Sequence, residues 1–486
     1  MKKITIDPIT RLEGHGKIEI FLNDSGAVEN AYLQIPELRG FEKFCEGRPA
    51  EEMPRIVPKI CGVCPGVHHL ASAKAVDEVY KVKVPSAGKK LRQLFYQAHN
   101  FHSHTAHFYA LAAPDFVVGP AADKAERNIL GVIAKVGLDA GKKVIESRSK
   151  AQKIQAMFGH QTHMTMAIPG GVSKGLNKEQ VDTIKEWADD LLEFAKFTNK
   201  IFEDVVLKNK EYVDLITSGP FKLVTNYMGL VDENNKMNMY DGKVRVVDHE
   251  GGEMYKFGPE NYLDYIAEHS EKWSYLKFAY LKKQGWKGLV DGPGCSFATV
   301  APMGRLNACD GMATPLAQAE YEKLFSTLGG KPVHNILAQH WARVIEMIYF
   351  AENLKELAND EEILSDDYRT IPNQTPSEGV GIVEAQRGTL IHHYKTDSDG
   401  MIRKANIIVA TAFNYANMNM GIRNAAKALV EKEGKINDGI LNMVEMAFRT
   451  YDPCFGCATH SLPGDMPLIV NIRNAGGDIV EKIRRD

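Results

Sequence analysis

The sequence is poor in cysteine for its length, has no long hydrophobic run and carries almost no excess of charge. Its seven cysteines among 486 residues are too few and too unevenly spaced for a disulfide framework, which favours a reducing compartment and metal ligation. No stretch approaches the roughly 18 apolar residues of a membrane-spanning helix. The formal net charge of -3 gives no electrostatic reason to expect nucleic acid or an anionic membrane as a partner.

The N-terminus also lacks the pattern of a secretory signal peptide. Two lysines follow Met1, but no apolar segment of about 7–15 residues comes behind them. We therefore expect a cytoplasmic protein with no direct membrane span. At 486 residues the chain exceeds the roughly 250–300 residues that one core usually serves, which predicts several packed layers or two fused lobes.

The hydrophobic pattern predicts an α+β fold that is predominantly helical. The N-terminal residues alternate apolar and polar side chains around an Asn-Asp-Ser-Gly turn at 23–26, which indicates a β-hairpin. Apolar residues at three-to-four spacing predict helices between 51 and 116 and at 121–158, 178–207, 315–328, 332–359 and 419–450. Strands are predicted at 379–385, 388–394 and 401–411, and an inserted β-containing segment at 209–312. We expect a core bundle of long helices, with the hairpin and smaller β-containing segments at its periphery.

Two Cys-x-x-Cys pairs stand at opposite ends of the chain, Cys61-Gly-Val-Cys64 and Cys454-Phe-Gly-Cys457. At this spacing both sulfurs of a pair can reach one metal ion from a turn or a helix start. The four thiols together form a soft ligand set that suits a thiophilic transition metal. Structural zinc is the commonest occupant of four thiolates, and a redox dithiol is a further alternative. Nothing local brings the two pairs together, so the fold must do so.

Other candidate residues have ordinary structural explanations when they are taken alone. Glu13 in a hairpin is usually solvated or salt-bridged, and an arginine such as Arg387 beside buried carboxylates is usually a structural ion pair. The histidines at 99, 102, 104 and 107 fall on two faces of a helix, which favours packing and hydrogen bonding over metal binding. The lone cysteines are Cys45, Cys295 and Cys309, and we expect them to be inert.

Ordered motifs around the cysteine pairs resemble those of nickel-iron hydrogenase large subunits from end to end of the chain. The matching segments are Arg11–His15, Arg39–Glu42, Cys61–Ala73, His107–Phe116, Pro169–Gly171, His340–Arg343, Glu384–Gly388 and Asp452–His460. The resemblance implies the catalytic subunit of such an enzyme, which cleaves H2 reversibly and heterolytically into protons and electrons. One departure is Gln386, where the family pattern has proline, and this change alters a cyanide-facing contact and the rigidity of the local backbone.

The resemblance implies that all four cysteines bind nickel. Cys64 and Cys457 would also bridge to an iron that carries carbon monoxide and two cyanide ligands, and Cys61 and Cys454 would be terminal. Four thiolates donate enough charge to support changes of nickel oxidation state, which redox-inert zinc cannot undergo. Heterolytic cleavage also needs a base close to the metal. Cys454 is the implied proton acceptor, and Glu13 is the implied relay.

Further residues around the metals receive roles from the same resemblance. Arg387 matches the arginine over the open face of the nickel, and Asp115 and Asp452 match the carboxylates that hold this arginine. His68 lies one helical turn after Cys64, so its ring is placed to donate a hydrogen bond to the bridging sulfur and tune its basicity.

A second metal site and a removable C-terminal extension are also implied. Glu42, the backbone carbonyl of Ile407 and His460 match the ligands of a magnesium or iron(II) ion. Large subunits of this family are commonly precursors that an endopeptidase cuts after the histidine of the second cysteine motif. We therefore expect a catalytic domain at 1–460 and removal of 461–486.

Electrons must leave through partners, because no cysteines remain to bind iron-sulfur clusters in the usual fours. The resemblance implies an iron-sulfur small subunit, with further flavin or iron-sulfur chains, as in cytoplasmic multi-subunit hydrogenases. Two alternatives stay open: a zinc-stabilised four-cysteine binding or assembly module, and a metal-free quinone-site relative of a respiratory complex. Metal analysis separates the three: nickel and iron indicate the hydrogenase, zinc indicates the binding or assembly module, and no metal indicates the quinone-site relative.

Overall fold

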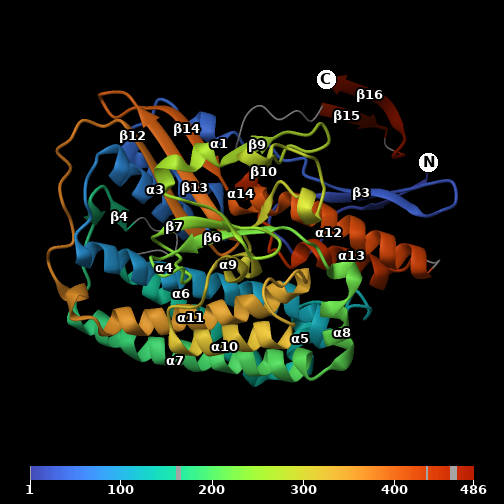
Figure 1. Cartoon of the computed structure of the whole chain (residues 1–486), viewed down its shortest axis with the longest axis horizontal. Helices are drawn as coiled ribbons and strands as arrows, with labels where there is room; N and C mark the ends of the chain where they lie inside the picture. Colours follow the sequence, from blue (N-terminus) through green and yellow to red (C-terminus); the bar gives the residue numbers. More distant parts are fainter. Residues whose placement is uncertain (1, 160–165, 434–435, 460–467, 475, 486) are drawn as a thin grey trace.

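Long helices packed side by side form the core of the protein (Figure 1). The structure is a computed structural model that describes residues 2–159, 166–433, 436–459, 468–474 and 476–485. Within it α11 packs between α7 and α4, α6 packs on α4, and α10 packs on α11. The α-helices are α1 (Phe41–Cys45), α2 (Met53–Ile56), α3 (Pro65–Val79), α4 (Ser86–Ala106), α5 (Ile129–Val136), α6 (Leu138–Met157), α7 (Lys178–Phe202), α8 (Lys210–Thr217), α9 (Pro302–Ala308), α10 (Pro315–Thr327), α11 (Gln339–Asn359), α12 (Ala410–Glu433), α13 (Asp438–Arg449) and α14 (Phe455–Ala458). The α+β, predominantly helical fold predicted from the sequence is confirmed.

Local side chains explain where several helices begin and end. α7 begins where the sequence predicts, with a capping box between Asn177 and Gln180. The helix predicted at 121–158 is two helices, because Gly137 adopts a φ of 92° between α5 and α6. α11 begins later than predicted, since Asn307 binds both the N–H and the carbonyl of Val333 and holds that segment outside the helix.

Small sheets lie mainly on one side of the long helices (Figure 1). The strands are β1 (Lys2–Ile6), β2 (Lys17–Leu22), β3 (Val28–Gln34), β4 (Ala167–Ile168), β5 (Gly171–Val172), β6 (Asn226–Val231), β7 (Lys243–Val247), β8 (Glu253–Phe257), β9 (Ile266–His269), β10 (Phe278–Leu281), β11 (Ala298–Thr299), β12 (Glu378–Ala385), β13 (Gly388–Thr396), β14 (Ile402–Ile408), β15 (Leu468–Arg473) and β16 (Ile479–Arg485). The predicted N-terminal hairpin is β2–β3, and β1 adds a third strand to it. Its turn is stabilised by Asn23 Oδ1, which accepts hydrogen bonds from the backbone N–H groups of Ser25 and Ala27.

The antiparallel sheet β12–β13–β14 carries α3 on one face. Glycines on β12 permit this close packing: a Cβ on Gly379 would lie 2.2 Å from the carbonyl oxygen of Ala75, and one on Gly381 would lie 2.1 Å from that of Ala71. The order of these contacts shows that α3 and β12 run in opposite directions. The turn between β12 and β13 therefore lies at the N-terminal end of α3, where Cys64 is located.

The segment 209–312 contains most of the remaining strands. β11, β6, β7 and β8 form a four-stranded sheet, in which β11 pairs parallel to β6 and the other pairs are antiparallel. α9 packs on β6, and most buried hydrophobic side chains of this sheet join the main core, whereas Tyr227 and Val247 form a small separate cluster with Ala308 of α9. Its status as an inserted unit stays a prediction.

The described C-terminal region contains the helices α12, α13 and α14 and a hairpin. The helix predicted near 419–450 is two helices, α12 and α13, and Asn437 caps the start of α13 by accepting a hydrogen bond from the N–H of Ile440. β15 and β16 pair antiparallel, so the described part of the predicted extension forms a hairpin. Removal of this extension stays a prediction.

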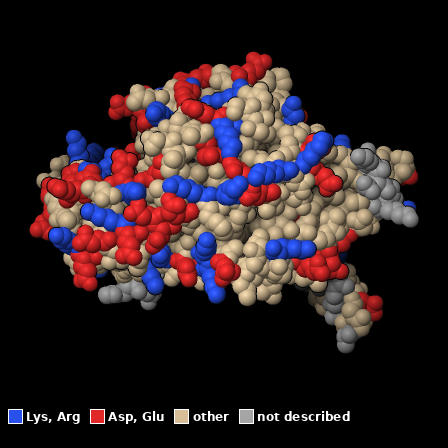
Figure 2. Space-filling model, turned by 90° about the horizontal axis from the view of Figure 1, so that it is seen from below, with Lys and Arg blue, Asp and Glu red and all other residues tan. Residues whose placement is uncertain are grey.

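The exposed faces carry charges of both signs. In the face shown in Figure 2, acidic and basic side chains are intermingled. Exposed pairs of opposite charge include Lys196–Glu193 on α7 and Lys200–Asp204, which joins the end of α7 to the residues that follow it. None of the described helices is both long and apolar enough to cross a bilayer.

Candidate metal centre

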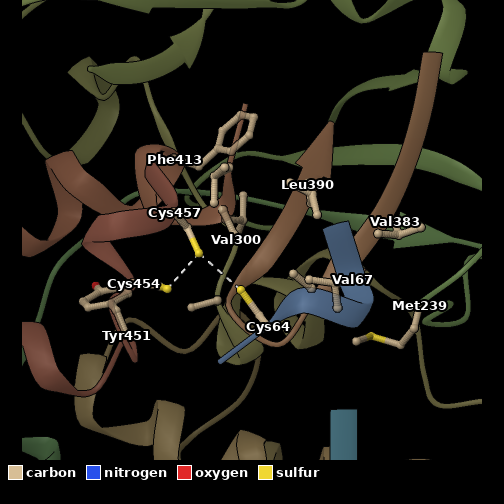
Figure 3. Close-up of a cluster of buried hydrophobic side chains, with 14 of the residues drawn as sticks. Cys64, Val67, Met239, Val300, Val383, Leu390, Phe413, Tyr451, Cys454 and Cys457 are labelled. Carbon is tan, nitrogen blue, oxygen red and sulfur yellow. Dashed lines mark hydrogen bonds between the residues drawn. The ribbon is translucent and has the colours of Figure 1, made fainter. Parts of the chain in front are cut away.

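The four thiols of the two Cys-x-x-Cys pairs meet in one buried cage. Their sulfur atoms all lie within 4.8 Å of one another. The Sγ–Sγ distances are 3.2 Å for Cys61–Cys454, 3.3 Å for Cys64–Cys457 and 2.8 Å for Cys454–Cys457. Figure 3 shows Cys64 reaching the other pair from the start of α3. None of the four is more than 3% exposed, and the predicted convergence of the two pairs is confirmed.

Backbone contacts between the two ends of the chain close the cage. Glu13 and Cys454 form a parallel β-bridge, with hydrogen bonds from Glu13 N–H to the carbonyl of Pro453 at 3.4 Å and from Phe455 N–H to the carbonyl of Glu13 at 3.0 Å. Gly14 is required beside this bridge, because it adopts a φ of 90° and a Cβ there would lie 2.8 Å from the nitrogen of Gly456. The glycine next to Glu13 therefore permits the two segments to touch.

Arg39 ties both cysteine loops together, a role that the sequence did not predict. Its Nη1 donates to the carbonyl of Ile60, which precedes the first pair, and to that of Gly456, which lies inside the second pair. Its backbone N–H also donates to the carbonyl of Thr459 at 2.7 Å. Arg39 lies in one of the matching motifs, but a lone arginine beside a glycine has no spacing signal that assigns it a partner.

The protein itself stabilises a thiolate at Cys61. The backbone N–H groups of Val63 and Cys64 each donate to Cys61 Sγ at 3.2 Å. Burial opposes the charged form, but hydrogen bonds with the other three thiols and the charge of Arg387 outweigh it, so the pKa of Cys61 lies well below its usual range.

Glu13 places a carboxylate directly against the cage. Its Oε2 accepts hydrogen bonds from Cys454 Sγ at 2.9 Å and from the N–H of Gly456 at 3.1 Å. Burial and then the negative charge of Cys61 raise the pKa of Glu13, although these hydrogen bonds and Arg387 act in the opposite direction. A half-buried carboxylate with a raised pKa in contact with a thiol can exchange a proton with it.

Arg387 lies near the cage thiols and is held by Asp452. Its Nε donates to the Asp452 carbonyl at 2.5 Å, and its Nη2 lies 3.0 Å from the Asp452 carboxylate. Its buried Nη1 has no hydrogen-bond partner within the described ranges. The predicted role of Asp115 is wrong: this carboxylate is paired at 2.5 Å with the partly buried Arg11 and at 2.8 Å with the buried Arg449.

His68 takes part in a buried chain of hydrogen bonds that leads away from the cysteines. Its Nδ1 lies 3.0 Å from His392 Nε2, His392 Nδ1 lies 2.7 Å from the Tyr394 hydroxyl, and that hydroxyl donates to Ser72 Oγ at 3.0 Å. The predicted hydrogen bond to the sulfur of Cys64 is not formed, because the ring is oriented by His392. His68 Nε2 has no partner among the residues that the structure describes, and burial lowers the pKa of His68 to about 4.

The predicted second metal site is only partly within the described chain. Glu42 Oε1 accepts a hydrogen bond from the backbone N–H of Ile407 at 2.7 Å. In a β-strand the N–H and carbonyl of one residue point to the same edge, so the Ile407 carbonyl also faces the Glu42 side of β14. His460 lies outside the described residues.

The histidines at 99, 102, 104 and 107 form hydrogen bonds, as the sequence predicts, and the inertness of the lone cysteines stays a prediction. His99 bonds to Gln155, His102 to Arg148, His104 to Glu346 and His107 to the carbonyl of Arg449. They therefore have separate partners and do not form one metal box. Cys45 and Cys295 are buried, and burial raises their pKa values to about 12 and about 11, which makes them poor nucleophiles.

The donor set fits a nickel-iron centre. Four converging thiols supply soft, charge-rich ligands. Near them lie a buried guanidinium, whose Nη1 has no partner among the described residues, and a carboxylate in contact with one thiol. A closed structural zinc site needs only the four thiols and requires neither the guanidinium nor the carboxylate.

Comparison with known proteins decides between the alternatives. A family model described as nickel-dependent hydrogenase matches residues 39–136 and 298–460, which is more than half of the chain. The chain belongs to the nickel-dependent hydrogenase family. A second model, described as HoxL-like, matches residues 3–38.

Full-length relatives of this hydrogenase chain agree with the assignment. An F420-non-reducing hydrogenase iron-sulfur subunit of Archaeoglobus profundus is 48% identical, and the match covers 100% of both chains. The NAD-reducing hydrogenase HoxS subunit beta of Cupriavidus necator is 36% identical, again over 100% of both chains. The crystal structure of an NAD+-reducing [NiFe]-hydrogenase in the H2-reduced state is 35% identical, with a TM-score of 0.89 and coverage of 95% of this chain and 100% of that chain.

Membership in this family establishes the activity. The chain is the catalytic large subunit of a nickel-iron hydrogenase, an enzyme with a nickel-iron active site. Its described residues bring four cysteines together in one cage. The zinc-stabilised module and the metal-free quinone-site relative are thereby set aside. The relatives are named as subunits of larger enzymes, so this hydrogenase subunit works with other chains.

Proposed function

We propose that all four cysteines bind nickel, that Cys64 and Cys457 also bridge to an iron with carbon monoxide and two cyanide ligands, and that Cys61 and Cys454 are terminal. When bound, this centre supplies the Lewis acid and the electron acceptor for heterolytic cleavage of H2. The contact between Glu13 and Cys454 is the observation that carries this proposal, since it provides the base that such cleavage needs.

The proton leaves through Cys454 and Glu13 in this proposal. Cys454 Sγ receives the proton, and Glu13 Oε2, at 2.9 Å, takes it over. Burial raises the pKa of Glu13, which brings the carboxylate closer to the range in which it both accepts and releases a proton near neutral pH. The N–H of Gly456 orients the same oxygen, so the relay is held in place before each turnover.

Arg387 supplies a fixed positive charge at the open side of the cage. Asp452 binds two of its nitrogens, which leaves Nη1 as the donor that can polarise H2. Asp452 has a φ of 55°, a conformation uncommon for non-glycine residues, and such backbone conformations occur where a side chain must be aimed. This conformation supports a functional role for the Arg387–Asp452 pair beyond a structural one.

The second metal site and the maturation step belong to the same proposal. Glu42, the Ile407 carbonyl and His460 would hold magnesium or iron(II), and the Glu42–Ile407 contact supports this grouping. A maturation endopeptidase would cut between His460 and Ser461. Intact-mass measurement of active enzyme tests the cut, because retention of residues 461–486 would refute it.

The electrons would pass to an iron-sulfur small subunit, then to flavin or iron-sulfur partners in the cytoplasm. The 48% identical relative is named F420-non-reducing, which supports an acceptor other than F420 for this enzyme. Purification of the native complex tests this, because activity with F420 or the absence of an iron-sulfur chain would contradict it.

Infrared spectroscopy with metal analysis tests the centre itself. Carbonyl and cyanide bands together with nickel and iron are the expected result. Zinc without such bands would refute the proposed centre.

A further inference from the structure

A second buried arginine, Arg305, binds the turn that carries Arg387. Arg305 lies on α9 and is 1% exposed. Its nitrogens donate to the carboxylates of Glu346 and Glu384 and to the carbonyls of Ala385 and Gln386. These are five hydrogen bonds of 2.7 to 3.1 Å, so every N–H of the guanidinium is used.

We propose that Arg305 is the positioning residue that sets where Arg387 stands over the metal cage. The inference rests on the role proposed above for Arg387. Arg305 fixes the two carbonyls immediately before Arg387, at 2.7 and 3.1 Å. The Arg387 carbonyl is itself bound by Asn414 Nδ2 at 2.8 Å, so three successive carbonyls of the turn have fixed partners.

The backbone of the turn has no freedom to adjust if the contacts with Arg305 are lost. It joins Ala385 to Gly388, which are paired across β12 and β13. Gly388 has a φ of 126°, and a Cβ there would lie 2.4 Å from the carbonyl oxygen of Val300. Asp452 binds the far end of the Arg387 side chain. The position of Nη1 is therefore fixed by contacts at both ends of Arg387.

The carboxylates around Arg305 support a role in orientation. Glu346 and Glu384 are both 0% exposed, and His104 binds Glu346 at 2.7 Å. Buried ion clusters add little net stability over apolar packing of similar volume, because desolvation offsets their attraction. Glu384 Oε1 also accepts from Thr389 Oγ1 at 2.8 Å, so it links the strand on the other side of the turn to the same cluster. The cluster thus holds both sides of the turn.

The test compares Arg305→Lys with Arg92→Lys in the assembled, metal-loaded enzyme. Arg92 is a matched control, because it is also 1% exposed and binds the Asp77 carboxylate and backbone carbonyls, but near β4 and β5. Lysine keeps the charge in both variants but cannot reach several acceptors in one plane.

We expect R305K to bind nickel and iron as the wild type does. Its H2 turnover per nickel should fall about tenfold or more, because a displacement of ~1 Å in a catalytic group costs up to about 10²-fold. The KM for H2 should change by less than about twofold, since ground-state binding is untouched. The carbonyl and cyanide bands should shift in R305K and stay in place in R92K, because a displaced cation changes the local field.

Turnover of R305K within about twofold of R92K, with unshifted bands, overturns the inference. If R305K does not yield folded, nickel-loaded enzyme, Glu384→Gln is measured instead, because glutamine keeps the side-chain shape but weakens the contact with Arg305. Unchanged turnover and unshifted bands in E384Q also overturn the inference.

Arg387→Lys is measured in parallel. An impaired R387K with an unimpaired R305K contradicts only the inference, whereas an unimpaired R387K contradicts the proposed role of Arg387. Absence of the bands from the wild type contradicts the proposed centre.

Discussion

The carboxylate of Glu13 accepts a hydrogen bond of 2.9 Å from the thiol of Cys454, although 441 residues separate the two in the sequence. A β-bridge between the same residues fixes their backbones, so the contact does not depend on one flexible side chain. In the proposed relay, Cys454 in the last cysteine motif passes the proton to Glu13 in the first loop of the chain.

Replacement of Glu13 by glutamine should abolish this relay without disturbing the cage. Glutamine keeps the side-chain shape and can still accept from the N–H of Gly456, but it does not take up a proton. We expect H2 turnover per nickel and D2/H+ exchange to fall about 10²-fold or more, with nickel content unchanged. Glu19→Gln is the control, because Glu19 pairs with Lys3 and Lys17 in the N-terminal sheet. E13Q enzyme with more than half of the wild-type turnover would contradict the relay.

Loss of one cage thiol should remove the metals, whereas loss of a lone buried thiol should not. Cys457→Ser removes a proposed bridging ligand from a site whose sulfurs lie within 4.8 Å of one another. Cys295→Ser and Cys309→Ser are matched controls, since both residues are buried outside the cage. Nickel and iron per chain are measured by elemental analysis. Wild-type nickel content in C457S would show that the cage is not the binding site.

Replacement of Asp115 should lower stability, whereas replacement of Asp452 should lower turnover. Asp115→Asn breaks a buried cluster with Arg11 and Arg449, which we expect to lower the free energy of unfolding by about 3–5 kcal/mol. Turnover per nickel should be retained, because Asp115 does not hold Arg387. Asp452→Asn should instead lower turnover, since it weakens the group that aims Arg387. Denaturant unfolding and turnover are measured on both variants, and equal losses of turnover would contradict this division.

The sequence was informative where the signal is local. The Cys-x-x-Cys spacing, the Asn-Asp-Ser-Gly turn and the helical periodicity each depend on neighbouring residues, and the structure has the corresponding cage, hairpin and helices. The ligand roles came from family resemblance, since no spacing reveals which metal four thiols bind.

The sequence could not predict in the same way which charged side chains pair with one another inside the core. Asp115 was expected to bind Arg387, but Arg11 and Arg449 bind it instead, and only tertiary packing decides which of these pairs form. The anchoring roles of Arg39 and Arg305 had no sequence signal, because a single arginine has no period and its acceptors are backbone carbonyls of remote segments.

Gln386 should destabilise the metal-free protein relative to an apolar residue of similar shape. The side chain is 0% exposed, and neither amide atom has a hydrogen-bond partner within the described ranges. We expect Gln386→Met to raise the free energy of unfolding of metal-free protein by about 1 kcal/mol, because it removes an unsatisfied buried amide. Gln339→Met is the matched control: Gln339 Oε1 accepts from the N–H of Met303 at 2.7 Å, so this change should destabilise. Urea unfolding measures both, and destabilisation of Q386M would contradict the argument.

Buried neutral histidines should make the protein lose stability as the pH falls below neutrality. Burial lowers the pKa of His69 and His104 to about 4 and that of His340 to about 3. In the unfolded chain each of them titrates near 6.5, so below that pH the unfolded state binds more protons than the folded state. The free energy of unfolding should therefore fall between about pH 6.5 and 4, with a slope that approaches about 1.4 kcal/mol per pH unit for each histidine.

Urea unfolding of the metal-free protein across this pH window measures that slope. His340→Asn should reduce it by about one proton, because the uncharged side chain no longer titrates in either state. His15→Asn is the control and should not reduce the slope, since His15 is exposed and its pKa is raised by Glu37. A profile that stays flat as the pH falls through the window would mean that these histidines are protonated in the folded state, and the burial argument would then be wrong.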